Sequence, residues 1–188
     1  TYGSPRIFEE LLAKGIFVSE NTVAKYMREI GLDARLKKKF RVLTTNSNHD
    51  GPIAPRRFKY EESLPVRPYE VLAGDITYLR IGSRFIYLAV VMDLFNRQIL
   101  GWSMADSLHS QLVVDAMKMA LANCDSDTKI IFHSDRGSQY ASEVFLNLIS
   151  DEEVIPSMSR RGNCYDNCYV ESWFKSLKTE WIYRRIYS

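Results

Sequence analysis

Three acidic residues have the types and spacing needed to hold divalent cations. Asp75 and Asp135 each lie in a strand-like run, 71–79 and 129–137, and thirty-five residues separate Asp135 from Glu171. Magnesium prefers oxygen ligands and keeps several waters, so a few carboxylates suffice to bind it. Two such ions, about 3.5–4 Å apart, can activate an attacking hydroxyl and stabilise the leaving oxygen at a phosphodiester. Three acids without a cluster of His or Cys are the donor set that such phosphodiester chemistry would need.

Glu171 is predicted to lie on an amphipathic helix within residues 161–180. At about 100° per residue, one side of this segment is apolar, and Asn167, Glu171 and Lys178 fall on a strip beside it. Their functional groups would then lie at the rim of a core, which suits a catalytic carboxylate. The simpler alternative is a solvated helix edge on which Glu171 pairs with Lys175, four residues later. The apolar stripe consists of Val170, Trp173, Phe174, Leu177 and Trp181.

Four short sequence motifs accompany the three acids, and Lys178 lies two helical turns after Glu171. The motifs are GDITY at 74–78, YLAVVMDLF at 87–95, HSDRGSQY at 133–140 and GNCYDN at 162–167. Together with the spacing of the acids, they resemble the Asp, Asp, thirty-five, Glu core of retroviral integrases and bacterial insertion-sequence transposases. The chain is most similar to the catalytic reading frame of elements that build their transposase by fusing two frames. The resemblance covers nearly the whole chain.

The resemblance implies a transposase that carries out metal-dependent DNA cleavage and strand transfer at insertion-element ends, in DNA integration and recombination. Asp75 would bridge two Mg²⁺ ions, for which Mn²⁺ can substitute, while Asp135 and Glu171 would each hold one. Water would attack a phosphodiester at the element end, and the freed 3′-hydroxyl would attack another strand. Four further residues are expected to contact the DNA, mainly at its phosphates: Lys178, Lys175, Arg136 and Asn167. For Asn167 the alternative is that it caps the helix of Glu171 together with Asp166.

Two short helices are predicted ahead of the core, one from Ser4 to Gly15 and one from Ser19 to Gly31. Ser4 followed by Pro5 is typical of an N-cap and first helical position, Ser19 would cap the second helix, and a glycine would end each helix. The spacing is that of a helix-turn-helix, whose second helix could enter a major groove. A helical hairpin packed on the main domain is the alternative. The side chains that would face the DNA are Asn21, Thr22, Lys25 and Arg28.

The first part of the chain is basic and the rest is slightly acidic. Residues 1–69 hold 13 Lys and Arg against 8 Asp and Glu, whereas residues 70–188 hold 12 against 15. This distribution fits an arm that contacts double-stranded DNA ahead of an acid-lined core. Each neutralised phosphate adds salt-dependent affinity, so the basic run at 35–41 is expected to track the DNA backbone. Its central lysines are Lys37, Lys38 and Lys39.

The predicted organisation is a helix-turn-helix-like segment at 1–43, a linker at 44–68 and a catalytic core at 69–188. The linker composition, rich in Asn, Ser, Gly and Pro, predicts that core burial does not offset its ordering entropy. The expected order of elements in the core is three strands, then helix, strand, helix, strand and helix. This is the order of the α/β, ribonuclease-H-like fold, which is a mixed sheet flanked by helices in which the first and fourth strands are adjacent. The expected strands are 71–79, 85–92, 98–104, 129–132 and 154–158, and the expected helices are 110–123, 143–150 and the one that carries Glu171.

The cysteines and the apolar runs indicate the compartment. Cys124, Cys164 and Cys168 are odd in number and lack zinc-finger partners, which predicts a reducing environment. Cys164 and Cys168 could share a helix face, where packing is favoured over a metal pair because structural zinc needs four ligands. The longest apolar run, 85–92, is too short to span a membrane, and no signal pattern is visible. We therefore expect a cytoplasmic protein with no membrane partner, associated with the nucleoid when it is bound to DNA.

The resemblance also implies partners and leaves alternatives open. It implies a homo-oligomer on DNA, with fusion to or association with the product of the upstream reading frame. Compared with the resembling proteins, the chain begins part-way into the DNA-binding region and stops soon after the catalytic helix, so we expect a truncated chain. Two other functions stay open: a non-catalytic DNA-binding repressor of transposition, and a ribonuclease-H-like nuclease that cuts RNA in hybrids. Asp93, a fourth acid at the end of a predicted strand, is interpreted as structural.

Overall fold

The computed structural model of the chain describes residues 2–32, 49–59, 62, 64–82, 84–125, 129–160 and 167–185. The chain divides into two compact units, Thr1–Arg41 and Val42–Ser188. Lys37, Lys38 and Lys39 lie outside the described residues, as does most of the GNCYDN motif. Within the described part of the chain, no helix is long and apolar enough to cross a membrane.

The first unit contains two helices joined by a short turn, α1 (Ser4–Ala13) and α2 (Glu20–Glu29). Ser19 caps α2 as predicted, because its side-chain oxygen accepts a hydrogen bond from the Thr22 backbone N–H at 3.1 Å. The predicted cap of α1 is wrong by one residue: Gly3 is the N-cap, and Ser4 already belongs to the helix. The glycine after each helix adopts a left-handed conformation, with φ of 76° at Gly15 and 69° at Gly31, as is usual for a helix end.

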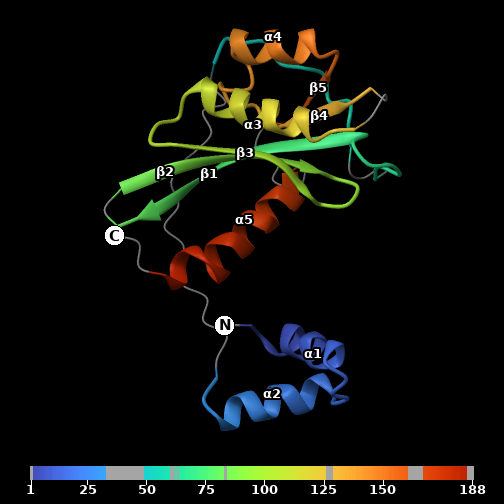
Figure 1. Cartoon of the computed structure of the whole chain (residues 1–188), viewed down its shortest axis with the longest axis vertical. Helices are drawn as coiled ribbons and strands as arrows, with labels where there is room; N and C mark the ends of the chain where they lie inside the picture. Colours follow the sequence, from blue (N-terminus) through green and yellow to red (C-terminus); the bar gives the residue numbers. More distant parts are fainter. Residues whose placement is uncertain are drawn as a thin grey trace. The chain divides into compact units, whose positions relative to one another are not determined.

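The second unit is built on a five-stranded mixed sheet (Figure 1). The order is β3-β2-β1-β4-β5, in which β1 pairs antiparallel with β2, β2 antiparallel with β3, β1 parallel with β4, and β4 parallel with β5. The first and fourth strands are therefore adjacent, as predicted. The strands are β1 (Val71–Ile81), β2 (Arg84–Asp93), β3 (Ile99–Ala105), β4 (Ile131–Ser134) and β5 (Ile155–Met158).

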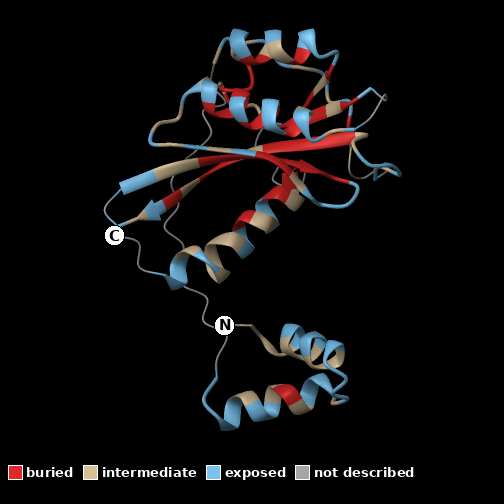
Figure 2. Cartoon of the chain, in the orientation of Figure 1, coloured by how far each residue is buried: buried red, intermediate tan, exposed pale blue. Residues whose placement is uncertain are grey.

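Helices cover both faces of this sheet, and each face has its own apolar core (Figures 1 and 2). On one face, α3 (Ser110–Ala122) and α4 (Glu143–Asp151) bury residues such as Leu112, Met117 and Phe145. On the other face, α5 (Cys168–Glu180) buries Val170 and Phe174 against the central strands, and a short 3-10 helix, Ile182–Arg184, follows it. The periodicity of the α5 stripe holds for these residues but not for Trp181, which is 55% exposed.

One boundary differs from the sequence prediction in a way that matters for the site. The fourth strand was expected at 129–132, whereas β4 runs from Ile131 to Ser134. His133 and Ser134 are buried in the structure although they are polar, and polarity alone had ended the predicted strand too early. The observed strand therefore ends directly before Asp135.

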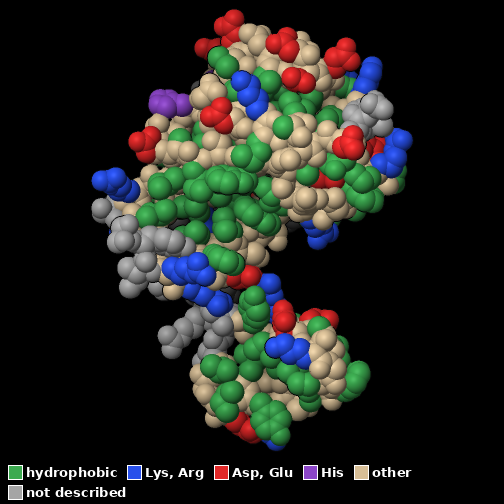
Figure 3. Space-filling model, in the orientation of Figure 1, with side chains coloured by type: hydrophobic (Ala, Val, Ile, Leu, Met, Phe, Trp, Pro, Cys, Tyr) green, Lys and Arg blue, Asp and Glu red, His purple; other side chains and the backbone are tan. Residues whose placement is uncertain are grey.

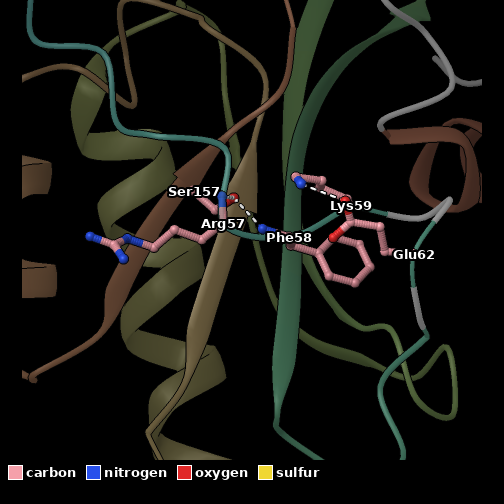
Figure 4. A network of polar contacts seen from close by, with 5 residues as sticks. All are labelled: Arg57, Phe58, Lys59, Glu62 and Ser157. Carbon is pink, nitrogen blue, oxygen red and sulfur yellow. Dashed lines mark hydrogen bonds and ion pairs between the residues drawn. The ribbon is translucent and has the colours of Figure 1, made fainter.

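The described part of the predicted linker packs on the second unit. Residues 52–59 have no helix or strand, yet Phe58 is only 6% exposed, and its ring meets that of His133 edge-on with centroids 5.5 Å apart. The Ser157 hydroxyl accepts hydrogen bonds from the backbone N–H groups of Arg57 and Phe58, both at 3.0 Å (Figure 4). The composition predicted too little core burial to offset the ordering entropy of this segment, and it did not reveal that Phe58 is buried in an apolar core.

Exposed apolar side chains lie near β3, which is an edge strand of the sheet. Figure 3 shows hydrophobic side chains gathered on this face of the second unit. Trp102 and Met104 on β3 are 47% and 51% exposed, and Met119 of α3 is 39% exposed.

We expect Ser157 to stabilise the packing of residues 52–59 on the second unit. Ser157→Ala would leave two backbone donors, those of Arg57 and Phe58, without their acceptor. The Phe58 donor is buried, whereas that of Arg57 is only partly buried. An unsatisfied buried donor costs about 1–3 kcal/mol, so we expect a loss of about 2 kcal/mol in the free energy of unfolding, measured by urea denaturation. The control Ser176→Ala changes an exposed serine of α5 and should stay within about 0.5 kcal/mol of wild type. Equal stability of the two variants would contradict the assignment.

Candidate active site

Parallel pairing of β1 with β4 brings Asp75 and Asp135 to the same level of the sheet. The register joins Gly74 to Ser134, and an aspartate follows each of these residues. Neighbouring strands lie about 4.8 Å apart, so consecutive residues on such a pair are close in space. Both aspartates are half-buried, and each also accepts a local backbone hydrogen bond at 2.8 Å, Asp75 from Ile76 N–H and Asp135 from Gly137 N–H.

The surroundings of Asp75 oppose its negative charge. Burial raises the pKa of its carboxyl well above the ordinary value of 3.8, and the charges of Asp135 and, less strongly, Glu171 raise it further. The Ile76 N–H and the Lys178 ammonium act in the opposite direction but do not outweigh them. A divalent cation would relieve both the desolvation and the repulsion. The charges of Asp135 and Glu171 thus both act on Asp75; that the three acids form one metal site stays a prediction.

Helix α5 is attached to β1, the strand that carries Asp75, by its N-cap residue and by a side chain of its last turn. Asn167, directly before the helix, donates a hydrogen bond from its amide to the Gly74 carbonyl at 3.2 Å. Lys178 Nζ donates to the Thr77 hydroxyl at 2.6 Å and lies 4.3 Å from the centre of the Tyr78 ring. These contacts fix the helix along β1 and hold the Lys178 ammonium beside the acids.

Asn167 does not have the role that the sequence suggested. It was expected to contact DNA, but its side chain is only 5% exposed and is bonded to the backbone of β1. Burial keeps the amide from reaching a phosphate, so its observed role is to attach α5. It occupies the N-cap position without a side-chain cap, and its amide oxygen has no hydrogen-bond partner.

The other predicted DNA contacts of the second unit differ in exposure. Lys175 is exposed on α5. Arg136 is half-buried and donates from Nε to the Ser159 carbonyl at 2.8 Å, while its own carbonyl contacts the His49 ring nitrogen Nε2 at 2.9 Å. Arg136 is thus held at the end of β5, next to Asp135.

In the first unit, three of the four predicted DNA-facing side chains of α2 are exposed. These are Asn21, Lys25 and Arg28, whereas Thr22 is half-buried and its hydroxyl lies 2.8 Å from that of Ser19. Lys25 lies 3.9 Å from Glu29, but both side chains are more than half exposed, so the pair holds the lysine weakly. The exposed face of α2 therefore offers two basic groups to a partner.

The residue types at this site fit magnesium, but the side chains are not arranged around a single ion in this structure. Asp75, Asp135 and Glu171 offer only hard oxygen ligands, and the pKa of Asp75 shows that negative charge is crowded there. Among residues 2–32, 49–59 and the later described ranges, no group of three or more His, Cys, Asp or Glu side chains is arranged to hold an ion. Glu171 is exposed on the first turn of α5.

The contacts of Asp93 and the state of the described cysteines involve neither Asp75 nor Asp135. Asp93 is fully buried and accepts hydrogen bonds from the backbone N–H groups of Tyr69 at 3.3 Å and Phe95 at 3.0 Å, as a structural acid would. Cys124 and Cys168 are free thiols. Burial raises the pKa of both, which keeps them protonated at neutral pH. Cys164 lies outside the described residues, so the suggested pair with Cys168 stays a prediction.

One residue near the acids was missed by the sequence reasoning. Tyr140 belongs to the HSDRGSQY motif, but a tyrosine five residues after Asp135 in a turn carries no periodic signal. In the structure it is 3% exposed, and the charges of Asp75 and Asp135 both reach it. Only the tertiary arrangement shows this proximity.

Comparison with known proteins supports the same fold. Residues 65–164 match the family model of the integrase core domain, and residues 1–40 match that of an HTH-like domain. Transposase InsF for insertion sequence IS3A of Escherichia coli (strain K12) is 40% identical over 182 residues, which cover 97% of this chain and 62% of that protein. The chain thus spans about three fifths of the length of this curated relative.

Two solved structures share the fold. The simian T-cell lymphotropic virus intasome, in complex with PP2A regulatory subunit B56 gamma, aligns with a TM-score of 0.57 at 20% identity, over 72% of this chain and 46% of that chain. The HTLV-2 integrase catalytic core domain in complex with magnesium aligns with a TM-score of 0.51 at 18% identity, over 60% of this chain and 69% of that chain. The predicted α/β, ribonuclease-H-like fold is therefore confirmed.

Removing the charge of Asp75 should stabilise the metal-free protein at neutral pH. Because its folded-state pKa lies above 3.8, the folded protein binds more protons than the unfolded chain between pH 3.8 and the raised value, so stability falls as pH rises through that window. In EDTA, Asp75→Asn should raise the thermal midpoint at pH 7 by about 2–4 °C or more, and the gain should shrink toward pH 4.

The control for this measurement is Asp106→Asn, which changes an exposed acid of the same unit and should leave the midpoint unchanged. A lower midpoint for Asp75→Asn at pH 7 in EDTA would show that the ionised carboxylate stabilises the fold and that the acids do not repel one another.

Proposed function

Because the chain belongs to the integrase core domain family, we propose that it is a transposase that cleaves DNA strands and transfers them at the ends of an insertion element. The observation that carries this proposal is the register of β1 and β4, which sets Asp75 beside Asp135. The likeness to transposase InsF of Escherichia coli supports it further. In this function the chain is a polynucleotidyl transferase with Asp75, Asp135 and Glu171 as its catalytic residues.

The same three residues are proposed to hold the divalent metal. Their all-oxygen donor set fits Mg²⁺, and the similar HTLV-2 integrase core was solved in complex with magnesium. We propose two ions, with Mn²⁺ as a possible substitute. When bound, the ions would lower the pKa of an attacking hydroxyl and stabilise the charge on the leaving oxygen.

The remaining side chains of the site would hold and orient DNA. We propose that the Lys178 ammonium contacts a phosphate that approaches Asp75, and its contacts with Thr77 and Tyr78 support this proposal. Lys175 and Arg136 are proposed as further phosphate contacts. In the first step, water attacks a phosphodiester at the element end, and the bond to the 3′ oxygen breaks to leave a free 3′-hydroxyl. In the second step, that hydroxyl attacks a phosphodiester of another strand, whose own 3′ oxygen leaves.

Double-stranded DNA is also the proposed partner of the first unit. The match to an HTH-like domain and the exposed basic face of α2 support this role. Assembly as a homo-oligomer on DNA, and fusion or association with an upstream-frame product, are proposed from the family alone. We also retain the expectation of a cytoplasmic, nucleoid-associated protein as a proposal.

The central test of this function is Asp135→Asn, which keeps the size of the side chain but removes the charge that would hold a cation. With a labelled element end, magnesium and a target duplex, we expect wild-type protein to yield joined strands and this variant to lose both cleavage and joining. Its fold should persist. The matched variant Asp93→Asn should lower the thermal midpoint, because it weakens the hydrogen bonds that this buried residue accepts from the Tyr69 and Phe95 backbone N–H groups, yet leave activity in the folded fraction.

Other outcomes of this assay identify the alternatives. Wild-type cleavage by Asp135→Asn would overturn the catalytic assignment. Digestion of an RNA–DNA hybrid without strand joining would indicate a nuclease. Bound but intact DNA in every condition would indicate a repressor.

The basic face of α2 is tested by its salt dependence. Lys25→Gln combined with Arg28→Gln should weaken binding to double-stranded DNA and reduce the slope of log K against log salt by about 2, since each lost phosphate contact removes about 0.9. Lys14→Gln removes an exposed charge at the end of α1 and should leave the slope almost unchanged. An unchanged slope for the double variant would mean that α2 does not face the phosphates.

A further inference from the structure

Tyr140 is buried beside the acid site, and its hydroxyl lacks a hydrogen-bond partner. Its ring packs against Phe132 and Phe145, with ring centroids 5.8 and 5.5 Å apart. The side chain is 3% exposed, and the hydroxyl oxygen is buried without a partner. Buried tyrosine hydroxyls usually find one, and an unsatisfied group costs stability. Phenylalanine would fill the same aromatic cluster without that cost.

The hydroxyl lies at the part of β1 that carries Asp75. A Cβ atom built on Gly74 would lie 3.3 Å from the Tyr140 oxygen and 2.3 Å from the Phe132 ring, so the aromatic side chains occupy the space above this glycine. Burial and, secondarily, the charges of Asp75 and Asp135 raise the pKa of the hydroxyl well above 10.0. It therefore stays protonated and is available as a donor close to two carboxylates.

We propose that Tyr140 is a positioning residue of the acid site, whose hydroxyl donates a hydrogen bond to a carboxylate oxygen of the Asp75–Asp135 pair when a divalent cation is bound. The hydrogen bond would hold that carboxylate in the orientation that binds the cation. This inference rests on the proposed function, because it assumes that the two acids bind metal. It explains why a hydroxyl without a partner is placed in an otherwise apolar cluster.

The test is the variant Tyr140→Phe in the full chain, with Tyr87→Phe as the matched control. Tyr87 is a half-buried tyrosine of β2 that packs against the same core but pairs with Tyr78, three residues beyond Asp75. The thermal midpoint is measured against Mn²⁺ concentration, together with cleavage of a labelled element end. The first readout does not depend on catalysis.

For Tyr140→Phe we expect an equal or higher midpoint in EDTA, since an unsatisfied hydroxyl is removed. We also expect an increase of about tenfold in the Mn²⁺ concentration that gives half of the midpoint shift, as a lost hydrogen bond to a charged group predicts. Cleavage at limiting Mn²⁺ should fall in parallel. Tyr87→Phe should match wild type in all three measurements.

Two results would overturn the inference while leaving the proposed function intact. One is a wild-type Mn²⁺ dependence for Tyr140→Phe, and the other is a lower midpoint in EDTA, which would show that the hydroxyl has a structural partner in the free protein. If wild-type protein shows neither a Mn²⁺-dependent shift nor cleavage, the proposed function and this inference are both overturned.

Discussion

The parallel pairing of β1 with β4 is the constraint on which the rest of the site depends. Its register joins Gly74 to Ser134 and so places two carboxylates on adjacent strands in a half-buried position. Burial and, next, the charge of Asp135 raise the pKa of Asp75 well above its ordinary value, so its ionised form is disfavoured. The divalent cation proposed above would relieve both the burial and the repulsion of these charges.

The neighbouring elements keep this arrangement in place. Asn167 and Lys178 attach α5 to β1 at the Gly74 carbonyl and the Thr77 hydroxyl, so the helix that carries Glu171 follows the acid-bearing strand. On the opposite face, the aromatic side chains of Phe132 and Tyr140 fill the space that a side chain at position 74 would need. The apolar cores on both faces thus hold the strands, while the polar side chains at their junction remain available for chemistry.

Much of this was predictable from the sequence, because strand and helix periodicity are local properties. The order of the elements, the adjacency of the first and fourth strands and the helix of Glu171 all followed from apolar patterns and from the resemblance. The end of β4 did not, since buried His133 and Ser134 look like loop residues when tertiary contacts are unknown. The docking of Phe58, the inward turn of Asn167 and the proximity of Tyr140 to the acids likewise depend on residues far away in the chain.

The central claim is that Asp75 and Asp135 together bind a divalent cation. The most direct measurement is X-ray diffraction from crystals soaked in Mn²⁺, with data collected at the manganese absorption edge so that the ion is located by its anomalous signal. The account predicts an anomalous peak at direct coordination distance, about 2.1 Å, from oxygens of both aspartates, with Glu171 turned toward the site. A protein that cleaves DNA with Mn²⁺ but binds the ion away from both aspartates would contradict it.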